Sequence, residues 1–112
     1  MRYRACVLAL FAWAAFPACP QDAGRELFTR VDKGHCIACH QLPAGAGPAT
    51  RSDLGPALAG ERMRALGKAQ VRAIISDPTR ANPATVMPPY GRHRILDERE
   101  IGVLTDFLHA LP

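Results

Sequence analysis

Two cysteines and a histidine lie within five residues of this sequence, in the stretch Cys36-Ile-Ala-Cys-His40. Thiols at this spacing can form a thiol–disulfide couple, supply part of a structural zinc site, close a small disulfide, or attach a c-type haem through two thioether bonds. The redox couple normally occurs in a β-α-β pattern and zinc needs further ligands, and the sequence shows neither. A plain disulfide is compatible with an exported protein but gives His40 no role.

Covalent haem attachment uses all three side chains. On one helical turn, residues i and i+3 face the same side, so both thiols can add to the two vinyl groups along one edge of a porphyrin. The next residue then brings its imidazole under the iron. We therefore predict one covalently attached haem c, with Cys36 and Cys39 as its thioether cysteines and His40 as an axial ligand of the iron.

The second axial ligand decides what such a haem can do. A thioether favours ferrous iron, raises the reduction potential and blocks ligand exchange, which suits electron transfer. Met87 lies in Thr85-Val-Met-Pro-Pro-Tyr-Gly91, where two prolines hold the loop extended, and we predict that it is this ligand. Met63 is expected to serve packing or to lie on the surface. The first alternative to Met87 is His93, and His35 and His109 rank below it.

A bound histidine also needs an acceptor for its second ring nitrogen, often a backbone carbonyl. The rigid turn Leu54-Gly-Pro56 is expected to supply one.

The first nineteen residues have the layout of a secretory signal. Arg2 and Arg4 precede an apolar run, residues 5–16, which is too short for a membrane span, and small residues follow. We predict a signal peptide at 1–19 with its cleavage point open, a cytochrome-sized domain at 20–112, and export to the periplasm. A lipid anchor at Cys19 is an alternative, although Phe16 and Pro17 depart from the usual lipoprotein pattern.

Composition excludes some functions and favours a cofactor. After residue 19 the only aromatic residues are Phe28, Tyr90 and Phe107, which is little bulk for a core, and a porphyrin would add to it. Without Arg2 and Arg4 the net charge falls from +4 to +2, and no basic stripe with aromatic residues predicts nucleic-acid binding. No arrangement of side chains predicts an independent catalytic site.

The hydrophobic pattern predicts an all-α domain of three to four short helices with long loops. One helix is expected over 22–31, with Asp22 as N-cap and Leu27, Phe28 and Val31 on its buried side. A second is expected over 68–77, and residues 41–60 and 79–94 are predicted loops. Asp97 and Glu100 have the spacing of a capping box for a last helix. The apolar stripe of that helix is Ile101, Leu104, Phe107, Leu108 and Leu111.

The sequence resembles the class I cytochromes c and, within them, the SoxX family. The stretches that carry the resemblance are GHCIACHQLPAG, DLGPALAG, VRAIISDPTRANPATVMPPYG and EIGVLTDFLHAL, which span most of residues 34–111. The segment DPTRANPATVMPPYG is the most specific of them. The resemblance implies a small cytochrome c fold, haem attachment at Cys36 and Cys39, and axial ligation by His40 and Met87.

Membership of the SoxX family would imply a role in sulfur oxidation. SoxX pairs with a larger haem subunit, SoxA, and the SoxXA complex joins thiosulfate oxidatively to a cysteine of the carrier SoxYZ, acting as an L-cysteine S-thiosulfotransferase. The role implied here is to pass electrons from the partner's haem to a soluble cytochrome acceptor. One departure is that only residues 92–97 separate Gly91 from Glu98, fewer than is usual in the family. A stand-alone periplasmic electron carrier therefore stays open, as does a catalytic or gas-sensing haem with a labile sixth ligand.

Overall fold

The computed structural model describes residues 19–112, so the predicted signal peptide lies outside the described residues except for Cys19. Four α-helices are joined by short 3-10 turns and long loops, and this part of the chain contains no strand. The all-α prediction is confirmed. None of the helices in this part is long and apolar enough to cross a membrane. In chain order the elements are α1 (Pro20–Thr29), η1 (Val31–Lys33), η2 (Cys36–Ala38), α2 (Gly60–Leu66), α3 (Lys68–Ser76), η3 (Pro78–Arg80) and α4 (Glu98–His109).

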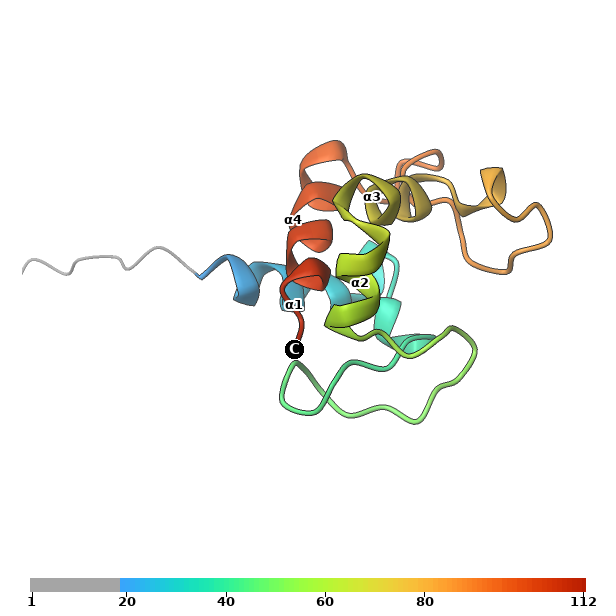
Figure 1. Ribbon diagram of the computed structural model, residues 1–112. Helices are drawn as coiled ribbons and strands as arrows, with labels where there is room; N and C mark the ends of the chain where they lie inside the picture. Colours follow the sequence, from blue (N-terminus) through green and yellow to red (C-terminus); the bar gives the residue numbers. More distant parts are fainter. Residues whose placement is uncertain (1–18) are drawn as a thin grey trace, which may run out of the picture.

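The first and last helices form the centre of the core. In Figure 1, α1 passes beside α4, while α2 and α3 lie along the other side of α4. The rings of Phe28 on α1 and Phe107 on α4 are 6.1 Å apart between centroids, tilted by 56°. This tilted arrangement has a centroid separation within the range that is favourable for two aromatic rings. All five residues of the predicted stripe on the last helix are buried, with exposed fractions from 0% to 6%.

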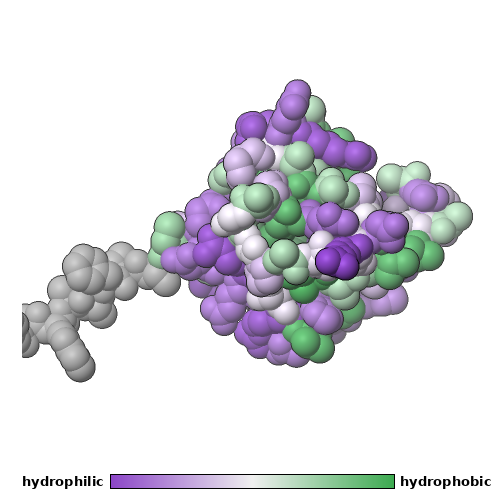
Figure 2. All heavy atoms as spheres, turned by 90° about the horizontal axis from the view of Figure 1, so that it is seen from below, coloured by the Kyte–Doolittle hydropathy of each residue, from purple (hydrophilic) through white to green (hydrophobic). Residues whose placement is uncertain are grey.

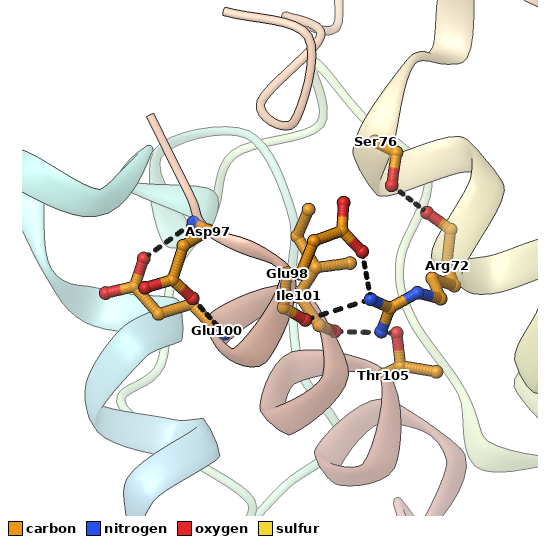
Figure 3. Close-up of polar contacts among 7 residues, drawn as sticks. All are labelled: Arg72, Ser76, Asp97, Glu98, Glu100, Ile101 and Thr105. Carbon is orange, nitrogen blue, oxygen red and sulfur yellow. Dashed lines mark hydrogen bonds and ion pairs between the residues drawn. The ribbon is translucent and has the colours of Figure 1, made fainter. Parts of the chain in front are cut away.

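The start of α4 is fixed by the predicted capping box. Glu100 N donates to Asp97 Oδ1 at 2.8 Å, and Asp97 N donates to Glu100 Oε2 at 3.0 Å (Figure 3). Arg72 on α3 also donates to the backbone carbonyl of Glu98 at 2.9 Å and pairs with its carboxylate. The capping box satisfies amide groups that a helix end would otherwise leave unpaired, and Arg72 ties α3 to the same end of α4.

Three details of the sequence prediction were wrong or incomplete. The first helix begins at Pro20 rather than Asp22, because proline fits the first helical turn, and Cys19 is its N-cap. That helix ends at Thr29, so Val31 falls outside it and is 76% exposed instead of buried. The short helix α2 was not assigned to a range from the sequence, and its Met63 is buried in the core.

The capping carboxylate of Glu100 also pairs with Lys33, which predicts an acid-sensitive contribution to stability. Lys33 Nζ lies 2.7 Å from Glu100 Oε1, and both side chains are mostly buried. The hydrogen bond from Lys33 lowers the pKa of Glu100 from its ordinary value of 4.5. A carboxylate whose pKa is lower in the folded than in the unfolded state stabilises the protein at pH values above its unfolded-state pKa. This stabilisation is lost as the pH falls through the lowered, folded-state pKa.

Glu100→Gln is therefore expected to reduce the free energy of unfolding near pH 7 by up to about 1 kcal/mol, because glutamine can still accept from Asp97 N but loses the charge paired with Lys33. Urea denaturation at a series of pH values measures this. The difference from wild type should shrink below about pH 4, where the carboxylate protonates. Glu26→Gln, at an exposed position on α1, is the control and should change little. An undiminished difference at low pH would show that charge is not the cause.

Candidate functional site

The two cysteines lie on a single helical turn, as the spacing predicts. The turn η2 begins at Cys36, Cys39 N donates to Cys36 O at 3.1 Å, and His40 N donates to the same carbonyl at 2.9 Å. In a 3-10 turn, residues i and i+3 are nearly eclipsed, so the two thiols face the same side. The segment thus has the backbone shape that thioether attachment along one porphyrin edge needs.

The imidazole of His40 is oriented by a carbonyl of the predicted turn. His40 Nδ1 lies 2.8 Å from Pro56 O. Because a carbonyl can only accept, Nδ1 must carry the proton, which leaves Nε2 with a free lone pair in the neutral ring. The backbone holds this turn in place, since Gly55 N donates to Cys39 O at 2.8 Å and Leu58 N donates to Gln41 O at 2.9 Å. His40 is thus held in the tautomer that binds a metal through Nε2.

Four predicted site residues meet in one cavity. Cys36, Cys39, His40 and Met87 all line a cavity of about 250 Å³ between the attachment segment, the loop after it, α3 and the Met87 loop. Most of the other side chains around it are apolar, including Val71, Ile74, Ile75, Leu104 and Leu108. Another cavity, of about 310 Å³, lies between α1 and the C-terminus, but no cysteine, histidine or methionine lines it. The chemistry that the sequence predicts is therefore concentrated in the first cavity.

The rivals to Met87 are placed differently. His93, His35 and His109 do not line the cavity. His93 is exposed beyond the Met87 loop, and His109 is at the end of α4. Met63 does line the cavity and is 4% exposed, so it is the other thioether within this space. The cavity thus contains two methionine sulfurs, only one of which comes from a loop.

The alternatives to haem fit this site less well. Burial raises the pKa of the Cys36 thiol to about 11. A thiol–disulfide couple works through a thiolate with a lowered pKa, so this environment is wrong for it. Among residues 19–112, no group of three or more His, Cys, Asp or Glu side chains is placed to hold a metal ion.

The loop that carries Met87 is closed at its base. Asp77 accepts from Thr79 N at 3.2 Å and lies 3.6 Å from Arg92 Nε, so it joins the residues before the loop to those after it. The hydrogen bond from Thr79 is the main cause that lowers the pKa of Asp77. Gly91 N and Arg92 N both donate to Ser76 O, at 3.0 and 3.1 Å. Sequence reasoning missed these anchors, although an aspartate before a proline is a known start of a turn.

The surface around the site is partly apolar. Leu54 and Val86 are 72% and 86% exposed, and both line the cavity. Seen from the side of the 41–59 loop, apolar residues reach the surface among hydrophilic ones (Figure 2).

Residues 20–108 match the family described as cytochrome c oxidase, cbb3-type, subunit III. The chain belongs to this family. It is a class I c-type cytochrome domain, and the family is one of haem-binding electron-transfer proteins. The match covers nearly all of the described residues, including the cavity and the attachment segment. No curated protein matches the chain.

Gly55 leaves room for the imidazole of His40, the histidine predicted to bind the iron. A Cβ atom at residue 55 would lie 2.5 Å from His40 Cε1 and 2.7 Å from Nδ1. Gly55→Ala should therefore push the imidazole off Pro56 O and destabilise the protein by about 1–3 kcal/mol. Electron paramagnetic resonance of the ferric protein should show a changed axial field.

The matched control is Gly102→Ala on α4. Its Cβ would meet only the flexible end of Arg72, at 3.2 Å. The iron spectrum should then stay as in the wild type. If Gly55→Ala also gave the wild-type iron spectrum, the imidazole of His40 would not be a ligand of the iron.

Proposed function

We propose that the protein is a monohaem electron-transfer cytochrome, with haem c attached through Cys36 and Cys39 and its iron bound by His40 and Met87. The observation that carries this is the cavity in which all four side chains meet. The orientation of His40 by Pro56 O supports the same assignment. When bound, the haem supplies a one-electron couple, and the protein supplies its attachment, its two ligands and an apolar surrounding.

This surrounding favours electron transfer over ligand chemistry. Two protein ligands on the iron leave no position for a substrate, and an apolar cavity resists the added charge of ferric haem, which raises the potential. The thiols and the imidazole that line the cavity, those of Cys36, Cys39 and His40, are assigned to the haem, and most of the remaining lining is apolar. We therefore place the function in electron transfer, without a catalytic site of its own.

The test is a pyridine haemochrome spectrum together with the mass of the protein exported to an oxidising compartment. Attachment through two thioethers should give one haem per chain and the pyridine haemochrome spectrum of a haem whose two vinyl groups have both become thioethers. Carbon monoxide should bind the reduced protein poorly at neutral pH, because Met87 holds the sixth position. Ready binding of carbon monoxide would instead favour a gas-sensing or catalytic haem.

For the biological role, we propose the SoxX subunit of a periplasmic SoxXA complex. The support is the resemblance of DPTRANPATVMPPYG to that family, and residues 85–88 and Tyr90 of this segment line the cavity. In this role a carrier thiol and thiosulfate form an S–S bond, the thiol releases its proton, and two electrons leave. Because one haem iron takes one electron at a time, this subunit would pass them in two steps to a soluble cytochrome.

A stand-alone periplasmic carrier is the second candidate, favoured by the segment after Gly91. Residues 92–97 serve the fold itself: Ile95 N and Leu96 N both donate to Tyr90 O, at 2.9 and 3.1 Å, and Leu96 is 2% exposed. Arg92 is paired with Asp77. This segment therefore offers little backbone for a partner to bind.

Stopped-flow spectroscopy separates the two roles. The haem-loaded protein is mixed with a SoxA-type subunit, SoxYZ and thiosulfate, and the reduction of its haem is followed. A SoxX subunit should be reduced only when all components are present, and should co-elute with the larger subunit. A stand-alone carrier should show neither behaviour but should still exchange electrons rapidly with another small cytochrome.

A further inference from the structure

Tyr90 joins the two segments that carry the proposed iron ligands. Its hydroxyl donates a hydrogen bond of 3.0 Å to the carbonyl of Gly34, which is 56 positions earlier. Gly34 comes two residues before Cys36, and Tyr90 comes three residues after Met87. Among the described residues, no other hydrogen bond connects residues 34–40 with residues 82–92.

The contact is tight and buried. The side chain of Tyr90 is 8% exposed and lines the cavity, and burial raises its pKa to about 12, so the phenol stays protonated and able to donate. Gly34 has a φ of +102°, and a Cβ there would lie 2.5 Å from Tyr90 Cε1. Only glycine allows both this backbone conformation and this approach of the ring.

Tyr90 is also better anchored than Met87. Its carbonyl accepts from Ile95 N and Leu96 N, and the next residue, Gly91, donates to Ser76 O at 3.0 Å. The backbone nitrogen of Met87 donates only within its own loop, to Thr85 Oγ1 at 3.2 Å. The hydroxyl of Tyr90 therefore ties the end of the weakly held Met87 loop to the segment that carries Cys36, Cys39 and His40.

We propose that Tyr90 is a positioning residue that keeps the Met87 loop closed and sets how often the thioether leaves the iron. The inference rests on the proposed function, because it needs an iron bound by Met87. An external ligand can bind only after the sulfur has left. A hydrogen bond present in the closed loop and lost on opening makes the open state rarer and slows ligand entry.

The test is the rate at which cyanide binds the ferric, haem-loaded protein carrying Tyr90→Phe. This change keeps the ring and removes only the hydroxyl. Binding should be about tenfold faster than in the wild type, a factor that corresponds to about 1.4 kcal/mol. The charge-transfer band of methionine-bound ferric haem should remain, because the sulfur still binds most of the time.

Thr105→Val is the matched control. Thr105 is 4% exposed, and its hydroxyl donates to Ile101 O at 2.8 Å on α4, away from the cavity lining (Figure 3). Both variants lose one buried hydroxyl hydrogen bond to a backbone carbonyl and should lose similar stability in thermal unfolding. Only Tyr90→Phe should speed cyanide binding.

The outcomes separate this inference from the proposed function. Absence of haem or of the methionine band in the wild type would overturn the proposed function. With both present, the role of Tyr90 would be overturned by either of two results. One is that Tyr90→Phe binds cyanide at the wild-type rate, and the other is that Thr105→Val speeds cyanide binding as much as Tyr90→Phe does. Acceleration confined to Tyr90→Phe supports it.

Discussion

A chain with serine at both Cys36 and Cys39 is expected to hold no covalent haem and to be largely unfolded. Serine cannot form the thioether bonds, so the porphyrin would be lost when the protein is denatured or extracted. The mostly apolar lining of the cavity of about 250 Å³ would then lose the porphyrin and contact water. A domain whose whole stability is only about 5–15 kcal/mol is expected to unfold when it loses that burial.

Haem staining on a denaturing gel and far-ultraviolet circular dichroism measure this result. Cys39→Ser alone should keep one thioether through Cys36 and a haemochrome band shifted toward that of a free vinyl group. Cys19→Ser is the control, because Cys19 is exposed at the start of α1 and outside the cavity. Covalent haem in the double variant would contradict the attachment assignment. A haem-free double variant that unfolds cooperatively would show that the core does not depend on the cofactor.

The parts of the structure that the sequence predicts well are those decided by local pattern. The capping box of α4 needs only Asp97 and Glu100 at the right spacing, and the buried stripe follows from helical periodicity. The attachment turn is likewise local, since both thiols lie within four residues. Even the acceptor for His40 could be placed approximately, because Pro56 restricts its own backbone and that of the residue before it.

Contacts between distant segments could not be predicted in the same way. The hydrogen bond from Tyr90 to Gly34 depends on how α1, α3 and α4 pack, and nothing in either local sequence encodes the pairing. The burial of Met63 follows from the position of α2 beside α3 and α4 rather than from its polar neighbours. The exposure of Val31 has the same kind of cause, because the helix stops two residues earlier and the chain turns away.

Met87→Ala is expected to lower the reduction potential of the haem and to open the iron to external ligands. Losing the thioether removes the ligand that stabilises ferrous iron, and water or an added ligand takes its place. The fall should be on the order of 0.2 V, within the span of about 0.8 V that axial ligands cover. Spectroelectrochemical titration measures the potential. Carbon monoxide, poorly bound by the wild type, should bind the reduced variant readily.

Met63→Leu is the control for this assignment, because both sulfurs lie in the same cavity lining. Leucine keeps the volume and removes the thioether, so the potential and the methionine charge-transfer band should persist. If the band were lost in Met63→Leu and kept in Met87→Ala, the iron ligand would be the sulfur of Met63 on α2. Survival in both single variants and loss in the double variant would show that the two sulfurs substitute for each other. The assignment to Met87 therefore requires that the band disappear in Met87→Ala while Met63 is still present.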